Sequence, residues 1–170
     1  MKRMKQYIAA MAALFSVASL HADEAATAPA PAETAPAVTA YVNGAQFLTG
    51  RPMADAQYYV YLYSASWCGP CRAIMPRIVA QYSEMKANKV EIIVISCDRT
   101  ADAAKSYVEH YEAGLPGLHV ASESARNLPS ATSPQGIPHA IIVDAQGKVL
   151  HRGHGATVLN WKQICKPEQK

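Results

Sequence analysis

The chain has 170 residues, half of them hydrophobic, which suits one packed domain with appendages rather than two domains. Its formal net charge of +3 comes from the extreme N-terminus, because leaving out Lys2, Arg3 and Lys5 balances the remaining basic residues against the 13 acidic ones. A neutral remainder has no net attraction for nucleic acid or for an anionic membrane surface, so neither is expected as a partner.

The first 22 residues are organised like a secretory signal peptide. A basic start, MKRMK, is followed by an apolar run over residues 8–20 and by a small residue, Ala22, at the expected cleavage point. At about 1.5 Å per residue the run covers only about 20 Å, too short for a hydrocarbon core of about 30 Å. We therefore expect export, to a bacterial periplasm or out of the cell. The alternative is an uncleaved segment that tethers the protein.

Residues 23–38 are a linker by composition. They read DEAATAPAPAETAPAV and contain almost only Ala, Pro, Glu and Thr. Such a segment has too few large apolar side chains to offset the entropy lost on ordering. We expect a disordered linker over 23–38 and a folded domain over 39–170.

The first part of this domain alternates between strand and helix patterns. The aromatic and β-branched run YYVYLY, at residues 58–63, is short enough for a strand. Residues 72–85 carry apolar side chains at spacings of three and four, which predicts a helix that Pro76 should kink. The apolar run VEIIVIS, at 90–96, fits a strand that is covered on both faces.

The middle of the domain predicts shorter elements. Residues 100–113 should form a helix, with Thr100 as its N-cap and Gly114 as its stop. Residues 118–121 fit a short strand and residues 122–128 a helical turn.

The last part predicts a hairpin and a helix. Strands at 139–143 and 148–151 are joined by Asp-Ala-Gln-Gly, a typical hairpin turn. Residues 156–165 follow as a final helix. The alternating order predicts an α/β fold of three α/β/α layers, with helices on both faces of a mixed central sheet and the hairpin as its antiparallel edge.

Two cysteines separated by Gly-Pro, in SASWCGPCRA, lie where the first strand passes into the first long helix. A purely structural disulfide between Cys68 and Cys71 would close too small a loop to stabilise the fold much. A zinc site needs two further ligands, and His151 and His154, three residues apart, lie in a strand-to-loop setting. The spacing therefore favours a redox-active dithiol, and neither a metal nor another cofactor is expected.

These elements together resemble the thioredoxin superfamily. The resemblance rests on WCGPC between a strand and a helix that contains Pro76, and on Gly136-Ile137-Pro138 at the start of a later strand. The stretches VISCDRT and LPGLHVASESARNL, before GIPHAIIVDAQGKVL, are most similar to the exported TlpA-like and the tryparedoxin and nucleoredoxin branch. The resemblance implies a thioredoxin fold over 39–170, with an insert after the central strand.

The resemblance also implies a mechanism of disulfide exchange. Cys68 would be the nucleophile, because a helix N-terminus favours its thiolate and lowers its pKa from about 8.5. Cys71 would be the resolving thiol that attacks the mixed disulfide and releases the reduced product.

A second set of residues is expected to bind the substrate. The resemblance implies that Pro138 is cis and lies against the cysteines, the alternative being a trans proline at the start of a strand. The backbone of Ile137 could then pair with an extended substrate segment. Gly69 and Pro70 separate the cysteines, and Trp67 should lie over the motif as part of the docking surface, unless it is a core tryptophan.

Two positions depart from the family's pattern. Thioredoxins carry a buried acid six residues before the first cysteine, where this chain has Leu62, and TlpA-like reductases often carry a glutamate where it has Ile74. Both departures leave open which group deprotonates Cys71. His139 could serve as a proton relay, and His154 could contact the substrate or tune Cys68.

The remaining cysteines are predicted to be separate thiols. Cys97 should lie near the active-site edge, whereas Cys165 ends a helix that runs about 15 Å away from that edge. A disulfide needs Cα atoms within about 7 Å. Of the two thiols, Cys97 is expected to be the more redox-sensitive.

The sequence therefore predicts an exported thiol–disulfide oxidoreductase that reduces disulfide-containing protein substrates and takes part in cell redox homeostasis. Gly-Pro between the cysteines is the dipeptide of reducing thioredoxins, whose reduction potential is about −270 mV, against about −120 mV for the oxidant DsbA. Outside the cytosol, regeneration would need a membrane-bound thiol reductant as electron donor. The alternatives are a disulfide oxidase or isomerase of the same fold and a non-catalytic binding module.

Overall fold

The computed structural model describes residues 37–166. The expected signal peptide and residues 23–36 of the expected linker lie outside the described residues. The elements along the chain are α1 (Val38–Gly44), β1 (Tyr58–Ser64), α2 (Gly69–Ala87), β2 (Val90–Ser96), α3 (Ala101–Glu109), β3 (Gly117–His119), α4 (Glu123–Arg126), β4 (His139–Asp144), β5 (Val149–His154), the 3-10 helix η1 (Gly155–Asn160) and α5 (Trp161–Cys165).

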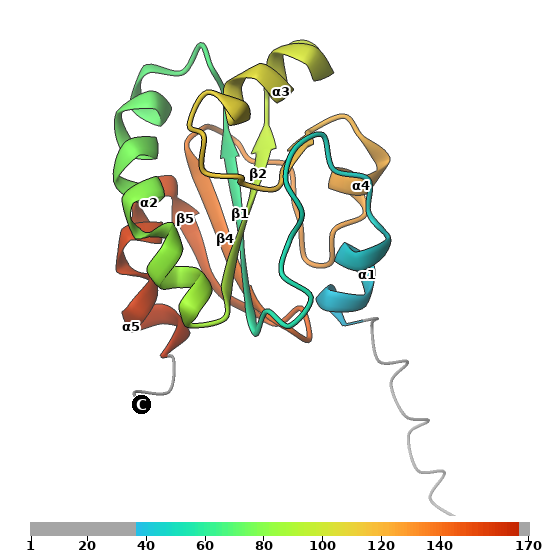
Figure 1. Ribbon diagram of the computed structural model, residues 1–170, viewed down its shortest axis with the longest axis vertical. Coiled ribbons are helices and arrows are strands. Elements are labelled where there is room, and N and C mark those ends of the chain that lie inside the picture. Colours follow the sequence, from blue (N-terminus) through green and yellow to red (C-terminus); the bar gives the residue numbers. More distant parts are fainter. Residues whose placement is uncertain (1–36, 167–170) are drawn as a thin grey trace, which may run out of the picture. The chain divides into compact units, whose positions relative to one another are not determined.

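The strands form one mixed sheet in the order β3-β2-β1-β4-β5 (Figure 1). Strand β1 pairs in parallel with β2, and β2 in parallel with β3. Strand β4 runs antiparallel to both β1 and β5. The mixed sheet and its hairpin edge are confirmed, and β3 with α4 forms the insert between α3 and β4.

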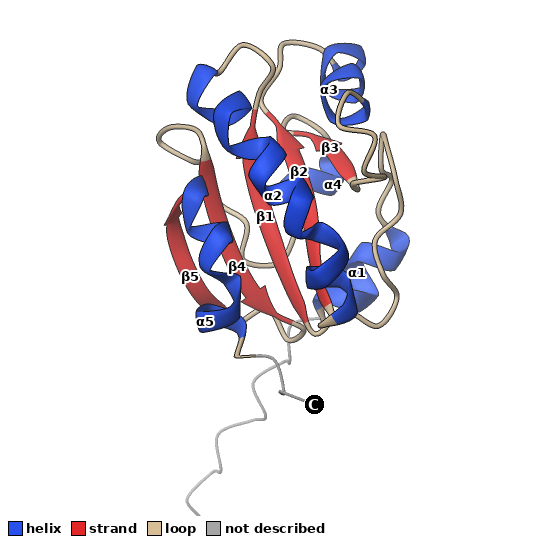
Figure 2. Ribbon diagram, turned by 60° about the vertical axis from the view of Figure 1, so that its left-hand side comes forward, coloured by secondary structure: helices blue, strands red, loops and turns tan. Residues whose placement is uncertain are grey.

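Helices cover both faces of the sheet, which gives the three expected layers (Figure 2). One apolar cluster joins the sheet to α2, α3 and α5, and a second joins its other face to α1 and α4. Strand β1 divides its side chains between the two faces. Its aliphatic residues Val60 and Leu62 belong to the first cluster, and Tyr59, Tyr61 and Tyr63 belong to the second.

Helix α1 was not predicted from the sequence. It begins at Val38, the residue assigned to the end of the linker, and the side chains of Val38 and Val42 are buried in the second cluster. Helix α1 thus includes one residue of the segment expected to be a linker.

The final helix also differs from the prediction. Residues 156–165 were expected to form one α-helix, but the segment starts as η1 and becomes α-helical only at Trp161. The His154 ring caps its start by accepting a hydrogen bond at Nδ1 from the Ala156 N–H, at 3.2 Å. A 3-10 turn at a helix end is common because it tightens the first turn.

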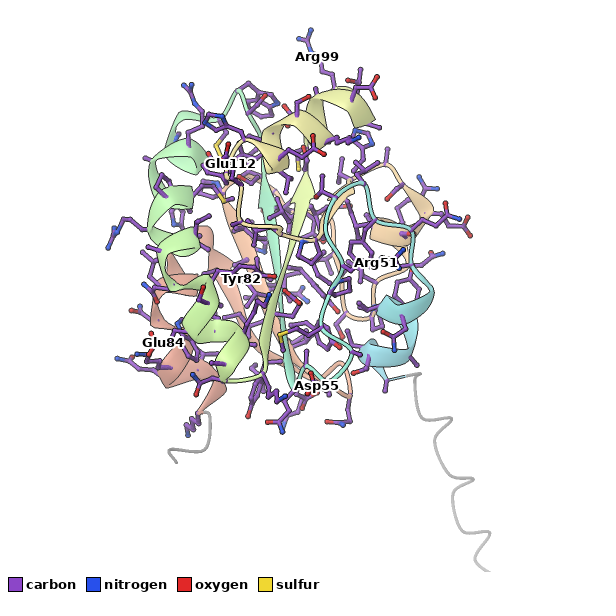
Figure 3. The ribbon with its side chains drawn as sticks, viewed as in Figure 1. Arg51, Asp55, Tyr82, Glu84, Arg99 and Glu112 are labelled. Carbon is purple, nitrogen blue, oxygen red and sulfur yellow. A yellow bond between two sulfur atoms is a disulfide. The ribbon has the colours of Figure 1, made fainter. Side chains whose placement is uncertain are left out.

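A buried carboxylate on β2 joins this strand to α2 and to the segment that precedes β1. Glu91 on β2 accepts hydrogen bonds from the Tyr82 hydroxyl at 2.7 Å and from the backbone N–H groups of Met53, at 2.7 Å, and Ile92, at 2.9 Å. Tyr82 reaches this site from α2 (Figure 3). These bonds satisfy a charge-bearing group that has no exposed surface.

Parallel strands β1 and β2 end at the same edge of the sheet, with Ser64 and Ser96 in register. The loop after β1 leads directly into α2 and contains the first cysteine of the motif. In residues 37–166, no helix has the length and apolar character needed to cross a membrane.

Candidate active site

The cysteine motif lies at the N-terminus of α2. Cys68 is the N-cap residue, and its sulfur accepts a hydrogen bond from the Cys71 N–H at 3.2 Å. Pro70 occupies the first turn, where a proline fits because the first N–H groups of a helix need no intrahelical acceptor. The local sequence therefore aims the Cys71 N–H of the first helical turn at the sulfur of residue 68.

Cys68 and Cys71 form a disulfide with a Cα–Cα distance of 5.2 Å. Cys68 retains 5% of its exposed area, whereas Cys71 retains none. Of the two residues, Cys68 is therefore the less deeply buried, and the order of their roles stays a prediction.

The Ile137–Pro138 segment lies beside the cysteine pair. The peptide bond between these two residues is cis. The Ile137 carbonyl oxygen is 3.8 Å from the Cys68 sulfur, and the Ile137 side chain packs on a small cluster of Ala65, Cys68 and Cys71. Residues far apart in the sequence thus meet at one sulfur.

Gly155 lies directly against Pro138. It was not singled out in the sequence. Its N–H donates to the Pro138 carbonyl oxygen at 2.9 Å. A Cβ atom at this position would lie 2.7 Å from the Pro138 Cβ and 3.2 Å from the Ile74 Cδ1. Only the position of this glycine, directly after the last strand, could have pointed to it.

Trp67 is on the surface, with 63% of its area exposed, so the alternative of a core tryptophan is wrong. Gly69 and Pro70 are exposed next to it. A Cβ added at Gly69 would have no neighbour within 4 Å. This side of the motif is open to a partner.

Asp98 fixes the loop that carries Trp67, and sequence reasoning missed it. Its carboxylate accepts hydrogen bonds from the Ser66 N–H, at 3.2 Å to each oxygen, from the Ser66 hydroxyl at 2.6 Å and from the Ser96 hydroxyl at 2.7 Å. The loop after β1 is thereby tied to the end of β2. The run Cys-Asp-Arg after an apolar strand was the available signal.

The two histidines, His139 on β4 and His154 on β5, are paired neighbours in the sheet. His139 pairs with Tyr63 on β1 and with His154 on β5, and its ring centroid is 6.1 Å from that of Tyr63. Tyr63 belongs to the apolar cluster on the face opposite α2. Neither histidine forms a hydrogen bond with Cys68 or Cys71 within the described chain. Burial, reinforced by the nearby Arg152, lowers the pKa of His139.

The other two cysteines are free thiols, as predicted. Cys97 packs against the cluster around Cys68 and Cys71, and burial together with Asp98 raises its pKa. Cys165 is buried in the first core cluster, and burial raises its pKa to about 12. A raised pKa disfavours the thiolate of both cysteines, so the greater redox sensitivity of Cys97 stays a prediction.

Comparison with known proteins assigns the family. A thioredoxin-like family model matches residues 55–149, which include β1, the cysteine motif and the strand after Pro138. The chain belongs to the thioredoxin-like family. Within this family it is similar to bovine (Bos taurus) nucleoredoxin, with 37% identity over 123 residues, covering 69% of this chain and 27% of the relative.

Two further proteins, one relative and one solved structure, are also similar to this chain. Thiol-disulfide oxidoreductase ResA of Bacillus cereus (strain ZK / E33L) is 31% identical over 87 residues, which is 51% of this chain and 49% of ResA. Tryparedoxin II from C. fasciculata superposes with a TM-score of 0.56 at 22% identity, over 75% of this chain and 91% of tryparedoxin, and shows a shared fold. These proteins confirm the resemblance to the tryparedoxin and nucleoredoxin branch. The matched region spans about a quarter of the nucleoredoxin and half of ResA.

Proposed function

We propose that this protein is an exported thiol–disulfide oxidoreductase that reduces protein disulfides through Cys68 and Cys71. The observation that carries the proposal is the disulfide between Cys68, which caps a helix N-terminus and keeps 5% of its area exposed, and Cys71, which is fully buried. The relative ResA is named a thiol-disulfide oxidoreductase.

The reaction starts from the reduced pair. The Cys68 thiolate attacks one sulfur of the substrate disulfide, which breaks the substrate S–S bond and forms a mixed disulfide. Cys71 loses its proton and attacks the Cys68 sulfur, which releases the second substrate sulfur as a thiolate. The substrate gains two electrons and two protons, and the enzyme pair is left as a disulfide.

The helix N-terminus supports the first step. The Cys71 N–H that points at the Cys68 sulfur, together with the dipole of a 19-residue helix, stabilises negative charge on that sulfur. Burial of Cys71 supports the second step, because a shielded thiol attacks the neighbouring mixed disulfide rather than a second substrate.

Substrate binding would use the exposed surface around this sulfur. The backbone of Ile137 can pair with an extended substrate segment as a strand adds to a sheet edge. Trp67, Gly69 and Pro70 would contact the other side of the same segment. His139 and His154 are paired on the face of the sheet away from α2. Any effect of these histidines on the cysteines would therefore be indirect, through the Ile137–Pro138 segment that precedes His139.

Export and the electron donor complete the proposal. The N-terminal segment 1–22 supports transfer to the periplasm or out of the cell. There the oxidised pair would be reduced by a membrane-bound thiol protein, because no glutathione pool supplies electrons outside the cytosol.

Two measurements test the activity and its direction. Turnover of insulin with dithiothreitol above the uncatalysed rate is expected, and a rate at background would leave only a binding module. The reduction potential of the Cys68–Cys71 pair, measured by equilibration with glutathione, is expected to be about −250 mV. A value near about −120 mV would instead assign disulfide formation.

A further inference from the structure

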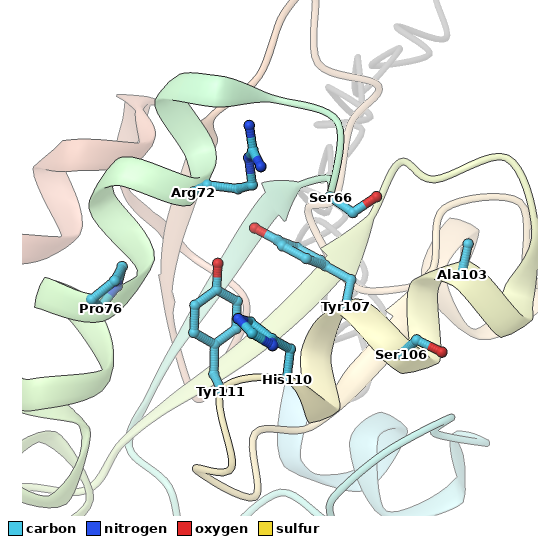
Figure 4. Close-up of a pocket in the computed structure, with 8 residues that line it drawn as sticks. All are labelled: Ser66, Arg72, Pro76, Ala103, Ser106, Tyr107, His110 and Tyr111. Atoms are coloured by element: carbon cyan, nitrogen blue, oxygen red, sulfur yellow. The ribbon is translucent and has the colours of Figure 1, made fainter.

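A groove of about 580 Å³ adjoins the cysteine motif, between the first turns of α2 and the length of α3 (Figure 4). Ser66, two residues before Cys68, and Arg72, the residue after Cys71, lie on its α2 side. Tyr107, His110 and Tyr111 form its α3 side and floor. Ligand sites commonly have volumes of about 300–1,000 Å³. The groove therefore has room for a side chain of a substrate bound at Cys68.

The groove carries the positive charge of Arg72, and the Asp98 carboxylate lies behind its Ser66 wall, hydrogen-bonded to the Ser66 hydroxyl. Arg72 has no ion pair and no side-chain hydrogen bond among residues 37–166, and no Asp or Glu lines the groove. An arginine with all five N–H donors free is suited to bind a carboxylate with two parallel hydrogen bonds.

Further donors surround the same space. The hydroxyl ends of Tyr107 and Tyr111 both point toward the side of the groove where Arg72 lies (Figure 4). The Tyr107 hydroxyl is 2.7 Å from the buried Ser64 hydroxyl, which holds its ring in place. The Tyr107 and Tyr111 rings meet edge to face, with centroids 5.6 Å apart. The two hydroxyl groups thus belong to aromatic rings that pack against each other.

We infer that this groove binds an acidic side chain of a protein substrate, close in sequence to the cysteine that Cys68 attacks. The inference rests on the proposed function. Ser66 and Arg72 of the groove flank the cysteine motif in the sequence, and the Ile137 carbonyl oxygen lies 3.8 Å from the Cys68 sulfur, so we expect an extended segment to contact both. At about 3.3 Å per residue, the acidic side chain would lie about two to four residues from the attacked cysteine. A small disulfide is too short to span both.

Matched peptides provide the test. Disulfide-bonded peptides carry one Asp, or one Asn in its place, about two to four residues to either side of the attacked cysteine. We expect kcat/KM to favour the Asp peptide about 5-fold at the best position, as for one charge-assisted pair at a partly exposed site. The Arg72→Gln variant should lose this preference. Taking the ratio of the two peptides cancels any effect of the variant on the Cys68 thiolate.

Two further variants sharpen the result. Arg77→Gln removes an equally exposed arginine of α2 that does not line the groove, and it should keep the Asp preference. Tyr111→Phe removes one hydroxyl but keeps the ring, and it should lower the preference about 2-fold. Rising salt should weaken the preference in the wild type because the pair is partly solvated.

The outcomes separate the two proposals. If the wild type reduces Asp and Asn peptides equally at every position, or if Arg72→Gln keeps the preference, the groove proposal is overturned while the reductase function stands. A preference that appears equally with a small acidic disulfide, such as a glutathione-type compound, also overturns it, because no protein segment is then needed. If no peptide is reduced at all, the proposed function itself fails.

Discussion

Cys68 and Cys71 differ in access although they are bonded to each other. The first lies at the helix cap with a small exposed area, and the second is fully buried in the first helical turn. The backbone geometry of a helix start thus makes two chemically identical side chains unequal. This difference supports the proposal that a substrate disulfide reacts with Cys68 first.

This inequality predicts opposite behaviour of two serine variants. Cys71→Ser should accumulate a mixed disulfide with substrate, because the resolving thiol is gone, and its turnover should fall at least about 10³-fold, as for other residues that act as a unit. Cys68→Ser should lose turnover without trapping substrate. Intact-mass analysis after mixing with a disulfide peptide checks both. A stable adduct on Cys71 in the Cys68→Ser protein would reverse the assignment.

Gly155 is the residue whose importance is seen only in three dimensions. A methyl group there would overlap Pro138 and press on Ile74. We expect Gly155→Ala to cost about 1–3 kcal/mol in stability, as for overpacking, and to lower kcat/KM for disulfide peptides by displacing the Pro138 segment.

The matched control for this variant is Gly44→Ala. Gly44 ends α1, and an added Cβ would meet nothing within 4 Å. Its activity should equal that of the wild type in the same peptide assay. Equal activity of Gly155→Ala would show that the substrate does not use the Pro138 segment.

At the scale of elements, β1 could be predicted from the sequence, whereas α1 could not. The run of aromatic and aliphatic residues at 58–63 is short and rich in residues that strands favour, so it predicts a strand locally. Helix α1 has only two buried valines, four residues apart, and is held by contact with the second core cluster. Its formation depends on the sheet behind it, so local sequence could not reveal it.

The tyrosines of β1 give a prediction for this element. The Tyr61 hydroxyl is buried and has no hydrogen-bond partner within residues 37–166, whereas the Tyr59 hydroxyl donates to the Thr39 hydroxyl at 3.0 Å. Removing an unsatisfied buried group relieves its desolvation cost. Tyr61→Phe should therefore leave the free energy of unfolding unchanged or raise it by about 1 kcal/mol.

Tyr59→Phe is the comparison, and it should lower the free energy of unfolding by about 1 kcal/mol because one hydrogen bond is lost. Urea denaturation of both variants under the same conditions gives the two values. A loss of stability in Tyr61→Phe as large as in Tyr59→Phe would mean that the Tyr61 hydroxyl is satisfied.

For the whole molecule, Glu91 couples stability to pH. Burial raises the pKa of this carboxyl above its ordinary 4.5, although the Tyr82 hydroxyl opposes part of the rise. The folded state then prefers the protonated form. The resulting stabilisation is complete below the unfolded-state pKa and is lost as the pH rises through the folded-state pKa.

The Glu91→Gln variant isolates this contribution. The free energy of unfolding of the wild type, minus that of the variant, should fall as the pH rises from 4 toward 7. Urea titrations at several pH values measure the difference, in which all other titrating groups cancel. A difference that stays constant or grows with pH would contradict the raised pKa.

The sequence alone determined the class of fold and the cysteine motif, because strand runs, helix spacings and turn residues are local patterns. That Ile137-Pro138 belongs beside the motif was implied by the resemblance to the thioredoxin superfamily. The sequence also separated Cys97 from Cys165 through the expected topology. Only the tertiary structure revealed Gly155 beneath Pro138, Asp98 beneath the Trp67 loop and the Arg72 groove, and it placed His139 against Tyr63. These features depend on which side chains meet across the sheet edge, and that is set by packing between distant segments rather than by the residues next to them in the chain.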